Sequence, residues 1–466
     1  MQNRIYFWEE AKEASINPYF TKVVDVLNEA LSAVSIDEAA ARIKLLIWSQ
    51  ILRAEECKDI TLDNLRVRFV MPHGKLSRRE LASAIMPRYE VVPFILTSGC
   101  VGADKCNICR SACPSGAIVI DDQRLRIDTS ACTNCGACVA ACPHGAVSFP
   151  TSSLEELMAE IQGLLSTEVD LEPRIIAIAC RGCSGLSDID PLPLPNVFML
   201  EIPSLAMASP ALLLSAFNMG ADGVALVHGG GECSSGISPD HWSKGIDFVR
   251  DFMDRLGMES KRIKTIEVDG DSESLGRELS NFTQAINELA PNPLKGIVES
   301  RVPSESLCLS NVIEGIRDKL GFSAACSIEG TCVPFGEVVV DADRCTGCGL
   351  CAGNCPTDAI SVKAAAGISG FELLFRHDRC VACEMCVNIC PEKCVTMNHV
   401  LDIEKLGGEP DVIFGDEYVR CRNCNAPFAP KSMINILKTK LQQAGNDAVD
   451  QIDLCPACKV AAKQMI

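Results

Sequence analysis

The sequence lacks the features that mark membrane-spanning, secreted and nucleic-acid-binding proteins. Its most apolar stretch, residues 210–231, is interrupted by Asn218, Asp222 and several glycines, so no membrane span is expected. The start, MQNRIYFWEEAKE, has no basic region followed by an apolar run, so no secretion signal is expected. Lysine and arginine number 43 against 61 acidic residues, a net charge of −18, which argues against nucleic acid as a partner.

Catalytic constellations are also scarce. The six histidines are scattered, and no Ser-His-Asp ordering, paired catalytic carboxylates or flavin fingerprint stands out. Glycines 229–231 follow a strand-like run, but neither a Lys with Ser/Thr nor a spaced G-x-G-x-x-G accompanies them. We therefore assign no catalytic residue and expect the chemistry to belong to partner proteins.

Cysteine, in contrast, is abundant, with 28 among 466 residues. Without a secretion signal, these thiols are interpreted as metal ligands in a reducing cytoplasm rather than as a disulfide framework. Intact metal–sulfur clusters would also favour an anaerobic or oxygen-protected setting. The acidic charge suits encounter with basic patches on other proteins.

The most regular cysteine pattern lies between Asp341 and Pro391. The spacing C-x2-C-x2-C-x3-C-P occurs twice there and is typical of 4Fe-4S binding, with three thiolates on one cluster and the fourth on a second. The expected ligand sets are therefore crossed. They are Cys345, Cys348, Cys351 and Cys390 for one cluster, and Cys380, Cys383, Cys386 and Cys355 for the other.

Residues 91–150 repeat this pattern with one departure. Where the first cysteine is due the chain has Ala103, and the nearest candidate is Cys100, across five residues in a loop that contains Gly102. We expect the loop to bring Cys100 back to the cluster; the alternative is a three-iron cluster that lacks this thiolate. The expected sets are Cys100, Cys106, Cys109 and Cys142 for one cluster, and Cys132, Cys135, Cys138 and Cys113 for the other.

Both segments resemble bacterial-type two-cluster ferredoxins. The tails PSGAI, PHGAV and PTDAI after three of the four closing prolines strengthen the resemblance, as does the short apolar run Val338 to Val340 that enters a motif. The resemblance implies two small α+β modules, 91–150 and 337–400, with two 4Fe-4S clusters each.

Residues 171–291 differ in kind. Strand-like runs alternate there with helical patterns, which predicts a parallel sheet covered by helices. The expected strands are 175–179, 197–202, 224–227 and 263–268, and the expected helices lie near 210–219, 242–256 and 275–289. Ligands gather beyond the carboxyl ends of such strands. The side chains at those ends are Cys180 and Cys183, then Ser204, then His228 and Cys233.

This middle region resembles the delta subunit of methyl-viologen-reducing hydrogenase, on the stretches IIAIACRGCSG, NMGADGVALVHGGGEC and FMDRLGMESKRIKTIEV. Members of that family hold a 2Fe-2S cluster and pass electrons between a hydrogenase and a heterodisulfide reductase-like flavoprotein. Cys180, Cys183 and Cys233 match family cysteines, whereas Ser204 and His228 stand where two more are due. His228 with the three cysteines can hold a 2Fe-2S cluster; the alternative is a domain that has kept its fold and lost its metal.

The flanking regions carry less chemistry. Residues 1–90 are expected to form a helical docking domain, with a helix following Ser35 and Glu38 and a strand at 65–69. Residues 292–336 are expected to form a linker. Five cysteines receive no assignment: Cys57, Cys308, Cys326, Cys332 and Cys394.

The tail, residues 415–466, carries CRNC and CPAC around an expected helix at 434–441. Two such pairs predict a tetrahedral four-thiol site with a structural zinc, and rubredoxin-type iron is the alternative. The predicted ligands are Cys421, Cys424, Cys455 and Cys458. The tail resembles the C-terminal extension of ferredoxin-like subunits in formate hydrogenlyase complexes, which implies a zinc-ribbon-like docking element.

The sequence as a whole predicts a multidomain α+β and α/β protein. Its expected function is that of a multi-cluster iron–sulfur electron-transfer subunit of a cytoplasmic redox complex. The partner expected from resemblance is a heterodisulfide reductase-like flavoprotein or a hydrogenase. Two alternatives stay open: a free soluble polyferredoxin, and a dithiol–disulfide reductase that uses Cys180 and Cys183.

Overall fold

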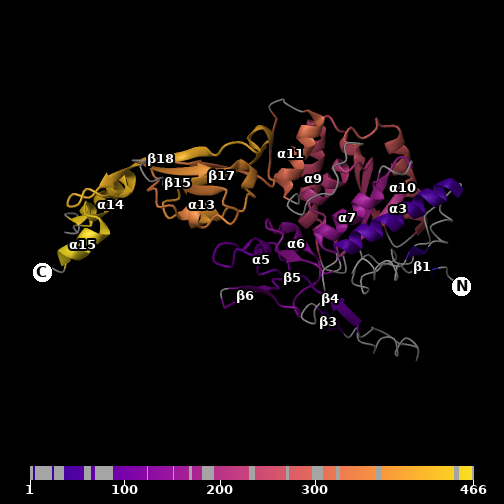
Figure 1. The fold of residues 1–466 in the computed structure, drawn as a ribbon, viewed down its shortest axis with the longest axis horizontal. Coiled ribbons are helices and arrows are strands. Elements are labelled where there is room, and N and C mark those ends of the chain that lie inside the picture. Colours follow the sequence, from indigo (N-terminus) through magenta and orange to yellow (C-terminus); the bar gives the residue numbers. More distant parts are fainter. Residues whose placement is uncertain are drawn as a thin grey trace. The chain divides into compact units, whose positions relative to one another are not determined.

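The computed structural model divides the chain into two compact units, one reaching Ala324 apart from Asp104–Cys106, the other formed by those three residues and Ala325–Ile466 (Figure 1). The structure describes residues 4–5, 24–25, 36–56, 65–68, 88–122, 124–150, 152–166, 171–180, 194–229, 237–268, 272–295, 308–321, 326–363, 370–444 and 451–463. Cys57, Cys183 and Cys233 lie outside these residues. Among the described helices, none combines the length and hydropathy that crossing a bilayer requires.

The parallel sheet expected for the middle region is present in the first unit. Its strand order is β10 (Val197–Ile202), β9 (Ile175–Cys180), β11 (Gly223–Gly229) and β12 (Ile263–Val268), and every neighbouring pair is parallel. All six side chains of β9 are buried, as in a strand covered on both faces.

Helices cover this sheet, and one of them comes from beyond the predicted limits of the domain. One face packs against Leu275, Leu279, Phe282 and Ile286 of α10 (Ser272–Asn287). Helix α8 (Pro210–Asn218), begun by the Ser209 cap, contacts α9 (Asp240–Arg255) and β11. The segment expected as a linker contains α11 (Leu309–Leu320), which packs on α8, and strand β13 (Ser327–Glu329).

The N-terminal region contributes a helix to the same unit. Helix α3 (Ile36–Glu55) crosses α7 (Leu154–Leu164) where Gly163 meets the backbone of Ser49, and Gln50 Nε2 donates to Glu160 Oε1 at 2.8 Å. Arg42 Nη1 donates to the Val197 carbonyl at 2.9 Å. Helix α3 therefore packs with the sheet domain. Short antiparallel pairs join β1 (Arg4–Ile5) to β2 (Val24–Asp25) and β3 (Leu65–Arg68) to β4 (Arg88–Val91).

The first cysteine-rich segment forms a small α+β module between α3 and α7. Two short helices, α5 (Ile108–Ser111) and α6 (Ala137–Ala141), each end near a closing cysteine. Strand β5 (Phe94–Ile95) pairs with β8 (Val147–Ser148), and β6 (Ile118–Asp121) pairs with β7 (Arg124–Ile127). This is the alternation that the ferredoxin resemblance implies.

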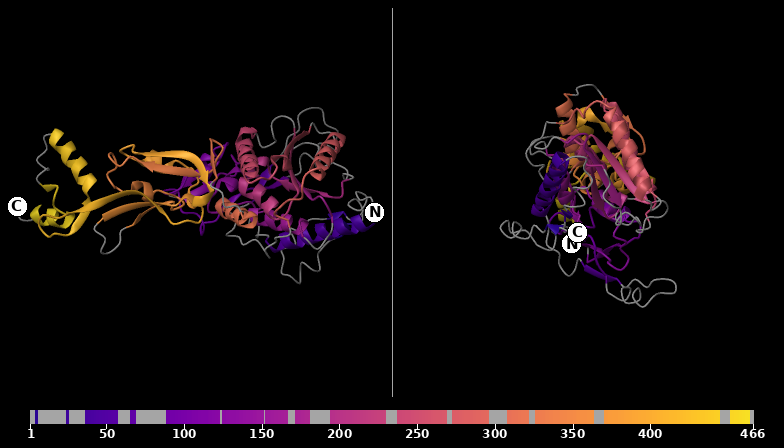
Figure 2. Two further views of the ribbon diagram at one scale, coloured as in Figure 1. Left: turned by 90° about the horizontal axis from the view of Figure 1, so that it is seen from above. Right: turned by 90° about the vertical axis from the view of Figure 1, so that its right-hand side faces the viewer.

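The second unit contains the other cysteine-rich module and the tail (Figure 2). One sheet has the order β13, β17 (Val395–Asp402) and β14 (Gly336–Val340), and the helices are α12 (Leu350–Gly353) and α13 (Met385–Ile389). A second sheet has the order β15 (Ile360–Lys363), β16 (Gly370–Phe375), β18 (Asp411–Arg420) and β19 (Pro427–Pro430). Strand β18 pairs with both β16 and β19 and so leads into tail helices α14 (Lys431–Gln443) and α15 (Pro456–Lys463).

Candidate metal centres

In the first module, one predicted ligand set lines a common cavity. Cys132, Cys135, Cys138 and Cys113 surround it together with apolar side chains such as Ile118 and Ile127. Burial raises the pKa of Cys138, and the neighbouring thiols Cys135, Cys132 and Cys113 raise it further. Four such thiols cannot all ionise beside one another without a compensating cation. Bound iron would supply it, so the donor set fits a 4Fe-4S cluster.

The other set of this module is less clearly assembled. Cys106 and Cys109 are buried, whereas Cys100 and Cys142 are half-buried. The Ala146 N–H donates to Cys142 Sγ at 3.3 Å, as the Ala117 N–H does to Cys113 Sγ at 3.3 Å. These amide contacts are typical of iron–sulfur ligands. The grouping of Cys100 with the other three stays a prediction.

In the second module, the cysteines of each predicted set lie close to one another. Cys345, Cys348, Cys351 and Cys390 line one cavity, and Cys394 lines it with them. Burial, together with Cys345 and Cys348, raises the pKa of Cys351 to about 11. Burial raises the pKa of Cys386 to about 12, and its electrostatic neighbours include the rest of the second predicted set: Cys380, Cys383 and Cys355.

Left-handed backbone shapes three of the four cysteine motifs. The residue after the second cysteine begins each short helix at positive φ: Gly136 at 76°, Gly349 at 73° and Glu384 at 58°. In the irregular motif, the corresponding Asn107 has φ −129°. The odd spacing of Cys100 is therefore accompanied by a different loop conformation.

The middle domain places two of its predicted ligands at one level of the sheet. Cys180 ends β9, and Ala179 pairs with Val227, so His228 on β11 lies level with Cys180. Neighbouring strands in register turn such side chains to the same face. The Cys180 thiol, 1% exposed, donates to the Pro203 carbonyl at 3.7 Å, and the His228 ring lies 5.3 Å from that of Trp242.

Ser204 connects the middle domain to the first module. Its Oγ donates to the Cys135 carbonyl at 2.7 Å and accepts from the Ala206 N–H at 3.2 Å. Ala206 and Ile237 pack with Cys135 in a buried cluster against which Trp242 rests. A predicted cluster site of the first module thus borders the carboxyl edge of the sheet. The sequence marks Ser204 only as a position where a family cysteine is due, and nothing near it signals this contact.

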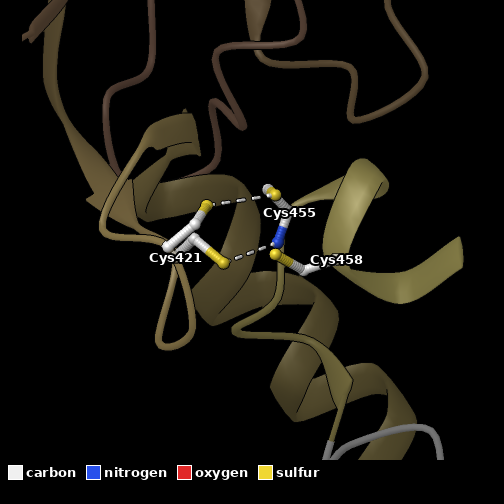
Figure 3. A group of neighbouring side chains, drawn as sticks. Cys421, Cys455 and Cys458 are labelled. Atoms are coloured by element: carbon white, nitrogen blue, oxygen red, sulfur yellow. Dashed lines mark hydrogen bonds between the residues drawn. The ribbon is translucent and has the colours of Figure 1, made fainter. Parts of the chain in front are cut away.

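The tail brings its four predicted ligands together, and Figure 3 shows Cys421, Cys455 and Cys458 among them. The sulfurs of Cys421, Cys424, Cys455 and Cys458 all lie within 4.8 Å of one another. The N–H groups of Cys455 and Cys424 lower the pKa of Cys421 to about 6, which favours the thiolate that a metal needs. Four thiols gathered this closely suit zinc or a single iron.

Comparison with known families agrees with this arrangement. Residues 175–290 match the family described as methyl-viologen-reducing hydrogenase, delta subunit. Residues 100–146 match the 4Fe-4S dicluster domain family, and residues 338–361 match the 4Fe-4S binding domain family. No curated protein matches the chain. The predicted architecture is confirmed: a domain similar to the hydrogenase delta subunit lies between two 4Fe-4S ferredoxin-type domains, which supports an iron–sulfur electron-transfer subunit.

Proposed function

We propose that the chain relays electrons, as one subunit of a larger cytoplasmic redox complex, between its own clusters and a partner that docks on the delta-type domain. The partner is a flavoprotein related to heterodisulfide reductase, or a hydrogenase. The observation that carries the proposal is the 2.7 Å hydrogen bond from Ser204 to Cys135, which joins the ligand-bearing edge of the sheet to a cluster site.

The contact between the two domains suits electron transfer. Ala206 and Ile237 pack with Cys135 in a buried cluster, and Trp242 packs against it, so apolar side chains surround the hydrogen bond. Trp242 also lies against His228, at the edge where the middle domain carries its candidate ligands. This continuity supports a route from the delta-type domain into the first module. Amide hydrogen bonds to ligand sulfurs, such as Ala117 N–H to Cys113, would tune the potentials.

The proposed cofactors follow from the thiol sets. Four 4Fe-4S clusters occupy the two ferredoxin-type domains, about 91–150 and 337–400. A 2Fe-2S cluster on Cys180, Cys183, His228 and Cys233 would complete the delta-type domain of about 171–291, supported by the common level of Cys180 and His228. Zinc would have a structural role in the tail of about 415–466, which would dock onto a partner. The region of about 1–90 is also proposed to be a docking domain.

The burial of Cys180 weighs against the dithiol reductase alternative. A thiol that attacks a disulfide must be exposed and readily ionised. Cys180 is 1% exposed and donates to a carbonyl. Electron relay through a bound cluster makes no such demand, because electrons cross a few ångströms of protein.

Anaerobic isolation of the native protein tests the proposal. We expect about eighteen irons with matching sulfide per chain, about sixteen from the four 4Fe-4S clusters and about two from the 2Fe-2S cluster. We also expect one zinc and stable co-purification with flavin- or hydrogenase-type subunits. Reduction of the bound clusters by the partner's own substrate should be visible by EPR. A monomer that purifies alone with full clusters would indicate the free polyferredoxin, and far fewer irons would refute the four-cluster assignment.

A further inference from the structure

The four ferredoxin-type motifs differ at the residue four positions after each closing cysteine. That residue is alanine in three motifs and cysteine in the fourth: Ala117, Ala146, Ala359 and Cys394. All four side chains are buried, with exposures between 1% and 4%. The position is therefore buried in every motif, and only the last motif puts a sulfur there.

The Cys394 thiol faces the same cavity as the predicted ligands. Its Sγ lies 3.5 Å from that of Cys390, and it shares a hydrogen bond with Cys345. The cavity is lined by five cysteines, the fifth being Cys394 beside Cys345, Cys348, Cys351 and Cys390. A cubane needs four thiolates, so one sulfur is in excess.

The distance between the Cys390 and Cys394 sulfurs can be compared with the distance between two ligands of one metal. Thiolates bound to one tetrahedral metal at about 2.3 Å lie roughly 3.8 Å apart. The 3.5 Å between Cys390 and Cys394 is close to this value, so both sulfurs can reach a single iron position. Cys390 is half-buried, whereas Cys394 is 4% exposed, so the more accessible ligand has a protected neighbour.

We propose that Cys394 is an alternative ligand for the iron held by Cys390 and can replace Cys390 without loss of the cluster. In the exchange, the Cys394 thiol releases its proton to solvent as its sulfur–iron bond forms. The bond from Cys390 breaks and that sulfur takes up a proton, so no oxidation state changes. The inference rests on the proposed 4Fe-4S cluster in this cavity and adds a reserve ligand to it.

Substitution in the full chain, purified anaerobically, tests the exchange. Cys390→Ala should keep the iron and sulfide content of the unaltered chain. The matched control is Cys355→Ala, at the same motif position but followed by Ala359; it should gain the EPR signal of a three-iron cluster. Relative to the unaltered chain, we expect this gain to be about tenfold larger in Cys355→Ala than in Cys390→Ala. The double variant Cys390→Ala, Cys394→Ala should match Cys355→Ala.

A transplanted thiol provides a test that does not depend on the folding of Cys390→Ala. Adding Ala359→Cys to Cys355→Ala should restore the four-iron cluster. Equal cluster loss in Cys390→Ala and Cys355→Ala, with intact clusters in the unaltered chain and Cys394→Ala, would overturn the exchange alone. The same holds if Ala359→Cys restores nothing. An unaltered chain without a cluster in this cavity would refute the proposed function as well.

Discussion

The two ferredoxin-type domains share one predicted arrangement of cysteine ligands but differ in the spacing and backbone conformation of their motifs. In the second domain, both motifs keep the full spacing and place left-handed residues before their helices, Gly349 and Glu384. In the first domain, the motif with Ala103 in place of a cysteine begins its helix from Asn107 at φ −129°. The difference teaches that the cysteine spacing and the turn conformation vary together, because the turn is what directs consecutive thiols toward one cluster.

The two domains also differ in what supports them. The first domain packs against the sheet domain: Ser204 donates a hydrogen bond to the Cys135 carbonyl, and Met207 contacts Gly136. The second builds its own support from long strands, and tail residue Lys440 pairs with Glu392 beside its closing motif at 2.9 Å. The two supports share no residue, so we expect perturbations to act on one domain and spare the other.

The largest effect is expected from disrupting the proposed zinc site of the tail. Cys421→Ala should abolish zinc binding and unfold the tail, since structural zinc contributes about 10–16 kcal/mol in small zinc-dependent folds. Zinc analysis and limited proteolysis near α15 measure this. The exposed thiol variant Cys308→Ala is the control. An unchanged zinc content, or loss of clusters from the first domain, would contradict the separation.

The crossing of α3 and α7 should be the most sensitive point of the first unit. A Cβ at Gly163 would lie 2.3 Å from Ser49 Cα, so Gly163→Ala should lower the free energy of unfolding by about 3 kcal/mol. Gly315→Ala in helix α11 of the same unit, where the atom nearest to an added Cβ lies 3.7 Å away, is the matched control. Tryptophan fluorescence during denaturation reports on this unit, because all three tryptophans belong to it. Equal shifts for both variants would show that the crossing is not tightly packed.

Ser204→Ala should have an intermediate effect. It removes a buried hydrogen bond and leaves the Cys135 carbonyl without it, at a cost of about 2 kcal/mol. The first domain should therefore lose its iron faster in a chelator than the second. Ser209→Ala removes a helix cap without touching the ferredoxin-type domain. If the two serine variants release iron at the same rate, the interface does not support the cluster site.

The smallest effect is a pH dependence confined to the second unit. Burial lowers the pKa of His377, with Lys405 acting in the same direction and Asp402, Glu337 and Asp378 opposing. The unfolded chain then binds a proton below about pH 6.5 that the folded chain does not. The free energy of unfolding should fall with decreasing pH there, by at most about 1.4 kcal/mol per pH unit.

His377→Gln provides the comparison, because its oxygen can still accept from the Asp402 N–H, which bonds His377 Nε2 at 2.9 Å. Urea midpoints of the second unit, measured from acid to neutral pH, should diverge between the two proteins only on the acid side. Parallel curves would assign the acid sensitivity to other groups, such as the metal ligands.

Local patterns in the sequence predicted the parallel sheet. The run IIAIAC predicts a strand, which is fully buried in the structure. The cysteine spacing predicts four crossed ligand sets, and the members of two of them line one cavity each. Long-range contacts were not predictable in this way. The packing of α3 on α7 joins segments about a hundred residues apart, and the bond from Ser204 to Cys135 depends on how two domains meet.

Two smaller features have a signal in the sequence besides the motif spacing. Helix α11 carries Val312, Ile313 and Ile316 at helical spacing inside the expected linker. The cysteine spacing assigns Cys394 no role, but aligning the four motif tails places it where the other three have alanine. The spacing in α11 gains its meaning from the packing of this helix on α8. The identity of Cys394 gains its meaning from comparison with the other three motifs.

The position of the first ferredoxin-type domain between α3 and α7 has a consequence for biogenesis. The two helices can pack only when the roughly hundred residues between them bring their ends together. A folded insert holds its two ends close together, so the loop between the helices costs no more entropy to close than a short loop. An unfolded insert raises the entropic cost of closing this loop by about 2 kcal/mol. Because the proposed 4Fe-4S clusters would hold this insert folded, we expect cluster delivery to precede completion of the sheet domain. On this proposal, a newly made chain would complete its sheet domain only after it has received its iron.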